Sequence, residues 1–207
     1  MDLNFTEAST LAIIDRQISG IEENFTPAQY EIIRQVIYSS ADLEYKSLLK
    51  FSQGALAKGA AALTAVTPII VDVPEIQVSI VHELQQTFTN PVYCCASMSR
   101  EVSNRATKAS SGLEILAQKY PKGIYLIGQD QAAMVTMVNL IGDKTIKPSL
   151  VIATPPMLID SETKKRLRNS NIPNIHITSA KGGANIATAI FNSLLQLAWQ
   201  VAQKSRN

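Results

Sequence analysis

The chain has 207 residues, of which 46% are hydrophobic and 17% charged, so it can bury a substantial core without disulfides or a structural metal. Nineteen Lys and Arg against seventeen Asp and Glu leave a formal net charge of +2, far short of the basic surface of a nucleic-acid-binding protein. No apolar run approaches the roughly 20 residues that a membrane helix needs. We therefore expect one domain over residues 1–207 that binds neither nucleic acid nor a membrane.

The cysteines and the first residues of the chain bear on its location. Cys94 and Cys95 are the only two cysteines, and neighbours on a strand point to opposite faces, so the two are not expected to pair. The opening residues, MDLNFTEAST, lack the basic-then-apolar order of a signal peptide. A cytoplasmic location is the expectation, because thiols stay reduced there.

The first 66 residues are predicted to be helical. Thr26 and Pro27 suit the cap and the first position of a helix. Apolar residues then recur at helical spacing, at Ile32, Ile33, Val36 and Ile37. A second, alanine-rich helix is predicted over residues 53–65. This N-terminal region either packs on the edge of the sheet that follows or supplies an interface to another chain.

After residue 66, apolar runs of strand length alternate with segments of helical period, which is typical of an α/β domain with a buried parallel sheet. Five strands are predicted, over residues 67–73, 92–96, 123–128, 149–154 and 174–178. The helices that connect and follow them are predicted over residues 73–87, 100–119, 130–141, 161–168 and 185–204. The helices after the first three strands are each expected to connect two parallel strands.

Several familiar chemistries lack their motifs. The chain contains no GxSxG, GxxxxGK[ST] or GxGxxG pattern, so serine-hydrolase, NTPase and dinucleotide-binding functions are not indicated. His82 and His176 are its only histidines, and no cluster of cysteines or carboxylates joins them, so no metal site is expected. His82 is expected on a solvated helix face, and His176 is expected to be a packed residue of a strand.

Ligands of doubly wound sheets bind beyond the carboxyl ends of the strands, where two segments stand out. In residues 179–185 (SAKGGAN), adjacent glycines and Lys181 either bind a carboxylate or phosphate group or form a tight turn that needs positive φ. Asp72 either acts as a general acid or base or caps the helix that follows it, and we favour the cap. The basic residues of 164–168 are interpreted as a solvated helix face.

A series of segments in the same order links this chain to a known family. They are residues 34–42 (RQVIYSSAD), 49–55 (LKFSQGA), 68–73 (PIIVDV), 107–111 (TKASS), 127–128 (IG), 147–152 (KPSLVI) and 181–183 (KGG). In these segments the chain resembles the precorrin-8X methylmutase family, which includes the cobalt-precorrin-8 methylmutases and whose members are isomerases of cobalamin biosynthesis. The order and spacing of the segments carry the resemblance, rather than any one of them.

The resemblance implies a flavodoxin-like, three-layer α/β/α fold with a five-stranded parallel sheet. It also implies a homodimer that binds its substrate near the subunit interface. Enzymes of the family move a methyl group between adjacent carbons of a corrin precursor, which needs a proton donor and a rigid hold on the macrocycle. No dissociable cofactor is implied. The substrate carries several acetate and propionate side chains, which suits the amide-rich, lysine-bearing loop at residues 181–185.

The site residues that the resemblance implies include several departures from the family. The family's catalytic histidine aligns with Tyr38, and a phenol is a weaker acid than an imidazolium, with an ordinary pKa of about 10 against about 6.5. A family arginine aligns with Lys108, which keeps the charge but not the two-pronged grip on a carboxylate. Thr10 replaces a serine, and Asp15 replaces an arginine. The implied substrate-binding residues are Thr10, Asp72, Lys108, Gly128, Lys181, Gly182 and Gly183, with Tyr38 as the catalytic residue.

The sequence leaves two main functions open. In the first, the chain is a methylmutase in which Tyr38 replaces the histidine as hydrogen-bond donor, while Lys108 and the Lys181 loop bind carboxylates. In the second, it is a catalytically inactive paralogue that binds a tetrapyrrole or a partner protein, because the changes gather at site segments while the framework is kept. A nucleic-acid or signalling module on the same scaffold is disfavoured by the near-neutral charge and the missing paired-acid pocket.

Overall fold

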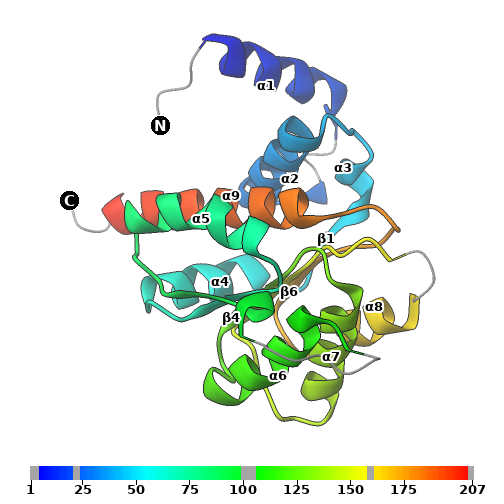
Figure 1. The fold of residues 1–207 in the computed structure, drawn as a ribbon. Helices are drawn as coiled ribbons and strands as arrows, with labels where there is room; N and C mark the ends of the chain where they lie inside the picture. The colour runs from blue at the N-terminus through cyan, green and yellow to red at the C-terminus, as the bar shows by residue number, and fades with distance from the viewer. Residues whose placement is uncertain (1–4, 21–23, 99–105, 158–160, 205–207) are drawn as a thin grey trace.

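A mixed sheet forms the middle of the computed structural model, which describes residues 5–20, 24–98, 106–157 and 161–204 (Figure 1). Its strands follow the order β1-β6-β5-β4-β2-β3. The five strands β2 to β6 are parallel and have the flavodoxin-like order 2-1-3-4-5 when numbered on their own. The strands are β1 Leu49–Phe51, β2 Ile69–Val71, β3 Val92–Cys94, β4 Ile124–Ile127, β5 Leu150–Ala153 and β6 Asn174–Ile177.

The predicted five-stranded parallel sheet is wrong in one respect, because the described part of the chain contains a sixth strand, β1. This strand lies within the N-terminal region that the sequence predicts to be helical, and it pairs antiparallel with β6. Three residues are too few to show the alternation that marks a strand. The five predicted strands all form, and each is shorter than predicted at one or both ends.

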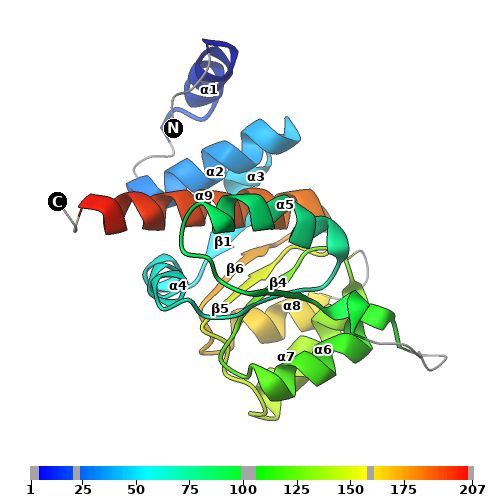
Figure 2. The same cartoon turned by 60° about the vertical axis from the view of Figure 1, so that its left-hand side comes forward.

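Helices cover both faces of the sheet and give the predicted three layers (Figure 2). Helices α4, α5 and α9 lie on one face, and α6, α7 and α8 lie on the other. α2 packs on the outside of α9, and α1 packs on α2 and extends beyond the body of the structure. The α-helices are α1 Phe5–Gln17, α2 Pro27–Ser40, α3 Tyr45–Leu48, α4 Ala55–Thr64, α5 Pro74–Gln85, α6 Lys108–Lys119, α7 Gln131–Gly142, α8 Ser161–Arg168 and α9 Ala184–Lys204.

Burial on both faces explains why the central strands are almost continuously apolar. Successive strand side chains point to opposite faces, so Ile124 and Leu126 of β4 join the core under α4, α5 and α9. Tyr125 and Ile127 of the same strand join the core under α6 and α7. The Tyr125 hydroxyl donates to the Tyr120 carbonyl at 2.8 Å, which satisfies the one polar group of this strand's side chains.

Local capping decides where two helices begin. The Gln29 amide donates to Thr26 Oγ1 at 3.3 Å and the Thr26 amide donates to Gln29 Oε1 at 2.9 Å. With Pro27 in the first turn, this confirms the predicted start of α2. α6 begins at Lys108 with Thr107 as its cap, whereas the prediction began at residue 100. Residues 99–105 of that predicted helix lie outside the described residues. Within the described ranges, no helix is both long and apolar enough to cross a membrane.

His176 is packed within β6, as expected, and this burial has a consequence for stability. Burial, together with the charges of Arg168, Lys164 and Lys50, lowers the pKa of His176 to about 4. In the unfolded chain the imidazole titrates near 6.5, so the folded state binds this proton less tightly. Stability that depends on the neutral ring is therefore present above about pH 6.5 and is lost as the pH falls towards about 4.

We expect the free energy of unfolding to fall by up to about 3 kcal/mol from pH 6.5 to pH 4, relative to the variant His176→Gln over the same interval. Urea unfolding of both proteins at half-unit pH steps measures the difference. His82 is exposed on α5, so His82→Gln should follow the wild-type curve. Equal acid sensitivity in wild type and His176→Gln would rule out His176 as the cause.

Candidate functional site

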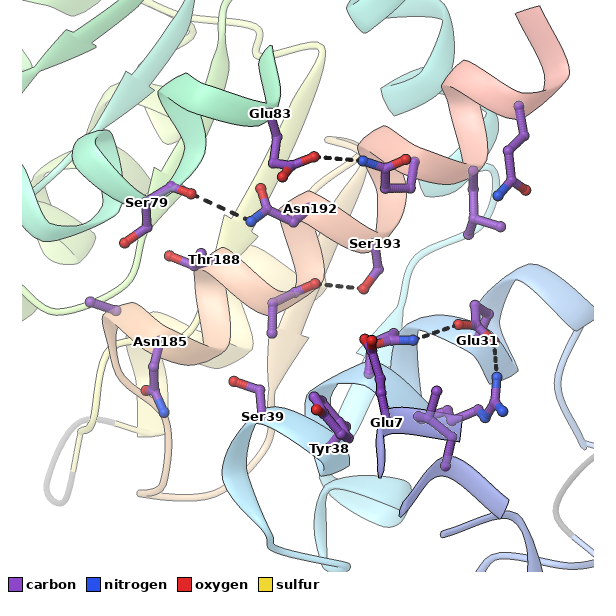
Figure 3. A pocket seen from close by; sticks show the side chains of 18 of the residues that line it. Glu7, Glu31, Tyr38, Ser39, Ser79, Glu83, Asn185, Thr188, Asn192 and Ser193 are labelled. Carbon is purple, nitrogen blue, oxygen red and sulfur yellow. Dashed lines mark hydrogen bonds and ion pairs between the residues drawn. The ribbon is translucent and has the colours of Figure 1, made fainter. Parts of the chain in front are cut away.

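A groove of about 970 Å³ runs between α1, α2, α5 and α9 (Figure 3). This volume is at the upper end of the range for small-molecule pockets. Polar side chains at helical spacing line two of its walls, so the groove is formed by helix faces rather than by loops. They are Glu75, Ser79 and Glu83 on α5, and Asn185, Asn192 and Gln196 on α9.

Side-chain hydrogen bonds fix α5 against α9 along this groove. Gln196 Nε2 donates to Glu83 Oε2 at 2.7 Å, and Asn192 Nδ2 donates to the Ser79 carbonyl at 3.5 Å. Asn192 Oδ1 is buried and has no hydrogen-bond partner in the described structure. Figure 3 shows both contacts bridging the two helices. The wall between α5 and α9 is therefore held in place by the residues that a ligand would meet.

Tyr38 lies at one end of the groove, in the last turn of α2, with 40% of its surface exposed. Ser39 and Asn185 lie near it at the same end, away from Glu83 (Figure 3). Asn185 belongs to the first turn of α9, two residues after Gly183. The groove thus joins Tyr38, the predicted catalytic residue, to the end of the loop of residues 179–185, called the glycine loop below.

The lining of the groove is acidic. It includes Glu7, Glu31, Glu75 and Glu83, and Arg34 is its one basic residue within the described ranges. Arg34 Nε lies 2.8 Å from Asp15 Oδ1, and Arg34 Nη1 lies 2.9 Å from Glu31 Oε2. Asp15 is therefore an ion-pair partner of Arg34. These residues therefore offer no unpaired positive charge to a polycarboxylate. A polycarboxylate in the groove would bind with its carboxylates pointing away from the glutamates.

Asp72 occupies the point where the strand order reverses, between β2 and β4. Its Oδ2 accepts hydrogen bonds from the amides of Gln129 and Asp130, both at 2.7 Å. The residue is fully buried, and its Oδ1 has no partner among the described atoms. Burial raises the pKa of Asp72, although the two amide bonds act in the opposite direction. The carboxylate anchors the loop that follows β4.

This anchoring differs from the cap that the sequence favours for Asp72. α5, the helix that follows Asp72, has Val73 at its cap position and no side-chain cap bond. Asp72 instead holds the loop before α7, a helix whose own cap is Asp130 through a 2.7 Å bond from the Ala133 amide. Asp72 and Gln129 are 57 positions apart, so no local pattern in the sequence predicts this contact.

Lys181 ties the glycine loop to the segment that follows α2. Its Nζ lies 2.6 Å from Asp42 Oδ2 and 2.8 Å from Glu44 Oε2. The hydrogen bonds to these two carboxylates raise the pKa of Lys181. Because Asp42 comes shortly after Tyr38, the ion pair fixes the loop before α9 relative to the end of α2 that carries Tyr38.

Gly182 and Gly183 form a tight turn against β5. Both have positive φ, 143° and 129°, and a Cβ on Gly182 would lie 2.0 Å from the Thr154 carbonyl oxygen. The Gly183 amide donates to that carbonyl at 2.7 Å, and the Thr154 hydroxyl donates to the Gly183 carbonyl at 3.0 Å. The amide of Gly183 is therefore used within the protein. Gly128 is also closely packed, because a Cβ at this position would lie 2.6 Å from Ile76 Cδ1.

None of the seven expected substrate-binding residues is itself part of the groove lining, and Lys108 and Thr10 illustrate this. Lys108 is exposed at the start of α6, on the opposite face of the sheet from Tyr38. Thr10 lies on α1 between the lining residues Glu7 and Leu11, and its hydroxyl donates to the Thr6 carbonyl at 2.9 Å. Within one chain, the structure therefore brings Tyr38 close to the end of the glycine loop but not to Lys108.

Sequence reasoning missed most of the groove. Glu75, Ser79 and Glu83 recur every four residues on α5, so they share one face of that helix. Asn185 and Asn192 recur at seven residues on α9 in the same way. This spacing of polar residues was present in the sequence, but it indicates a site only when the two helices are known to be neighbours.

Comparisons with known proteins give one family. The family model described as precorrin-8X methylmutase matches residues 6–197. The chain is 31% identical over 206 residues to a cobalt-precorrin-8 methylmutase of Synechocystis sp., covering 92% of this chain and 94% of that protein. It is 31% identical over 179 residues to a protein of the same name from Methanocaldococcus jannaschii, covering 84% of this chain and 82% of the other.

A solved structure gives the same result for the fold. The structure described as precorrin-8x methyl mutase from Thermus thermophilus matches with a TM-score of 0.84 and 27% sequence identity. The match covers 96% of this chain and 99% of the Thermus chain. The sheet, the helices on both of its faces and the N-terminal helices therefore have counterparts in that structure.

Proposed function

Because the chain belongs to the precorrin-8X methylmutase family, we propose that it is an isomerase of cobalamin biosynthesis that moves a methyl group between adjacent carbons of a corrin precursor. The observation that carries this proposal is the position of Tyr38. The residue aligned with the family's catalytic histidine lines a groove of about 970 Å³, which is large enough to take a bulky ligand.

In this proposal, Tyr38 is the hydrogen-bond donor to the macrocycle. Migration of the methyl group redistributes electrons over the ring, and a donor at a ring nitrogen stabilises that change in the transition state. A phenolic hydroxyl donates a hydrogen bond readily but gives up its proton less easily than an imidazolium. The expected chemistry is therefore the family rearrangement, assisted by a hydrogen bond.

The charges of the groove indicate how the substrate lies. Glutamates line the groove, so the acetate and propionate groups of the substrate are expected to face away from them. The end that holds Tyr38, Ser39 and Asn185 adjoins the Lys181 loop. We propose that the macrocycle covers Tyr38 and that at least one of its carboxylates reaches Lys181, exchanging with Asp42 and Glu44 as the partner of the ammonium group.

Replacing Lys181 by alanine is expected to weaken binding of a corrin polycarboxylate about tenfold, because one charge-assisted hydrogen bond is lost. The double variant Asp42→Asn, Glu44→Gln should bind more tightly than wild type, because it frees the ammonium group. Visible-absorbance titration with hydrogenobyrinic acid, the family's reaction product, measures both affinities. Lys58→Ala, at an exposed position on α4, is the control. Unchanged affinity in Lys181→Ala would remove Lys181 from the substrate site.

We further propose that the protein is a homodimer with the substrate near the subunit interface. Helix α1 extends beyond the body (Figure 2) and carries Ile13, which is 57% exposed. The groove between α1 and α9 offers a polycarboxylate only one basic residue within the described structure, and that residue is already paired. A second chain is thus a natural source of further positive charge for the substrate.

Light scattering after size-exclusion chromatography is expected to give a mass twice that of the 22.5 kDa chain. Ile13→Glu should shift the protein towards the single-chain mass, because it puts a charge into an apolar contact. Val66→Glu is the control, since Val66 is also an exposed apolar residue but lies at the end of α4, away from α1. A wild-type protein that elutes as a single chain and is fully active would contradict the dimer.

Genetic complementation tests the proposed function. The chain, expressed in a strain that lacks its own precorrin-8X methylmutase, should restore corrin synthesis and growth that depends on it. The same plasmid carrying Tyr38→Phe should not. Failure of the wild-type chain at normal expression would contradict the proposal and favour a protein that binds a tetrapyrrole without converting it.

Two further expectations belong to this proposal. A single domain over residues 1–207 is supported by the family match, which spans residues 6–197. A cytoplasmic location is supported by Cys94 and Cys95, which are both free and buried.

A further inference from the structure

A cluster of basic side chains surrounds His176, on the opposite face of the sheet from the groove. Lys50 of β1 lies directly opposite His176 of β6 in the antiparallel pair. Their neighbours Leu49 and Ile177 belong to the core under α9, so Lys50 and His176 point to the face that α8 covers. Lys164 and Arg168 lie one turn apart on α8, and both act on the charge of His176.

The two ring nitrogens of His176 have different surroundings. Nδ1 is hydrogen-bonded to Asn174 of the same strand, and Nε2 makes no hydrogen bond to the described residues. Asn174 Nδ2 donates to the Ile172 carbonyl at 2.9 Å, so Asn174 Oδ1 is the acceptor for His176 Nδ1, 2.8 Å away. In the neutral ring the proton is therefore on Nδ1, and Nε2 is an acceptor. A second proton would be taken up at Nε2, which makes no hydrogen bond to the described residues.

No acidic side chain balances this cluster within the described structure. The ion pairs of the described residues involve Arg34 and Lys181, not Lys50, Lys164 or Arg168. The Lys164 ammonium donates to the Ser179 carbonyl, and partial burial lowers the pKa of Lys164. The charged groups that face His176 are Lys50 from β1 and Lys164 and Arg168 from α8, and all of them disfavour its protonation. An anion bound among these positively charged groups would offset their mutual repulsion.

We propose that Lys50, Lys164, Arg168 and His176 form a binding site for a small oxyanion, either a carboxylate or a phosphate group, separate from the Tyr38 groove. The guanidinium and the two ammonium groups supply charge-assisted hydrogen bonds to its oxygens. His176 Nε2 supplies another bond once it is protonated, and the anion itself favours that proton. The sheet lies between this site and the groove. The oxyanion site is therefore proposed independently of the isomerase activity.

The test follows the ring signals of the two histidines by NMR while inorganic phosphate is added at constant ionic strength. The His176 signals should shift in a saturable way, and the pKa of His176 should rise by about one unit from its value of about 4. His82, exposed on α5 and remote from the cluster, is an internal reference and should not shift. The absence of a saturable His176 shift up to about 50 mM phosphate would overturn the proposal. Equal shifts at both histidines would also overturn it.

Matched variants separate a built site from a generally basic helix. Lys164→Gln and Arg168→Gln should each weaken phosphate binding about tenfold, whereas Lys165→Gln, exposed on the same helix, should stay within about twofold. Lys50→Gln provides a third variant that leaves α8 untouched, in case the α8 variants fold poorly. An equal loss in Lys165→Gln would mean a solvated basic face with no site.

A second titration identifies the source of the oxyanion. Hydrogenobyrinic acid that shifts His176 and competes with phosphate would assign the site to a carboxylate of a corrin. Phosphate binding without such competition would assign it to a free phosphate-class ligand. Both results support the oxyanion site. Neither depends on turnover, so failure of the site and failure of the proposed isomerase activity remain distinguishable.

Discussion

Replacing Tyr38 by phenylalanine is expected to lower the rate of methyl migration by about 10²–10⁴-fold, because it removes the one hydroxyl that is proposed to donate a hydrogen bond to the macrocycle. Binding of the corrin product should change by no more than about twofold, since the ring of Tyr38 and its place at the end of α2 are kept. Single-turnover absorbance spectroscopy measures the rate, and equilibrium titration measures the affinity. The effect should therefore be on turnover and not on binding.

Two further variants make this result interpretable. Tyr93→Phe removes a hydroxyl on the edge strand β3, outside the groove, and should turn over at the wild-type rate. Tyr38→His introduces the residue that the family resemblance predicts at this position. It should raise the rate, because an imidazolium is a stronger acid than a phenol by about 3.5 pKa units. A wild-type rate in Tyr38→Phe would mean that another group donates the hydrogen bond to the macrocycle.

Replacing Asp72 by alanine is expected to lower the free energy of unfolding by about 3 kcal/mol. The substitution leaves two buried amides, of Gln129 and Asp130, without their acceptor, and each such loss costs about 1–3 kcal/mol. In a domain of about 200 residues this corresponds to a melting temperature about 6–12 °C lower. Thermal unfolding followed by circular dichroism measures it.

Asp143→Ala is the matched control for this prediction. Asp143 is an exposed aspartate at the other end of α7, and its loss should leave the melting temperature nearly unchanged. Asp72→Asn keeps an oxygen that can accept both amides and should cost less than Asp72→Ala. Equal melting temperatures in Asp72→Ala and Asp143→Ala would show that the loop after β4 does not depend on the buried carboxylate.

Asp72 also gives a pH dependence with a defined sign. Burial raises the pKa of Asp72 in the folded state above its ordinary value of about 3.9, so the folded state binds this proton more tightly than the unfolded chain. The stability that Asp72 contributes is therefore greatest below about pH 3.9 and declines as the pH rises through the raised value. The stability of wild type minus that of Asp72→Asn should fall over the same interval.

The parts of the fold that the sequence predicts well are those with a strong local signal. Four of the five parallel strands, β2, β4, β5 and β6, are buried along their whole length, which favours apolar runs between turn residues. Helix α2 begins where Thr26 and Pro27 predict, because its capping bonds are all local. β1 was not predicted, because its three residues gain their conformation from pairing with β6, which lies about 126 residues later in the chain.

The candidate site was harder to predict, because its contacts join distant segments. The resemblance to the family predicts Tyr38 as the catalytic residue. The carboxylates that hold Lys181 and the amides that hold Asp72 lie far from them in the chain. The glycine loop left two interpretations open, and the positive φ of Gly182 and the use of the Gly183 amide fit the tight turn. The polar walls of the groove depend on how α5 and α9 pack, which periodicity alone does not give.

The most direct test of the central claim is the incubation of the purified wild-type protein with precorrin-8X under anaerobic conditions, followed by absorbance and mass spectra of the product. We expect conversion to hydrogenobyrinic acid, an isomer of the substrate, so the spectrum should change while the mass stays the same. A cobalt-containing substrate tested in parallel shows which form is preferred. Binding of the substrate without any change of its spectrum would contradict the claim that this chain is an isomerase that uses Tyr38.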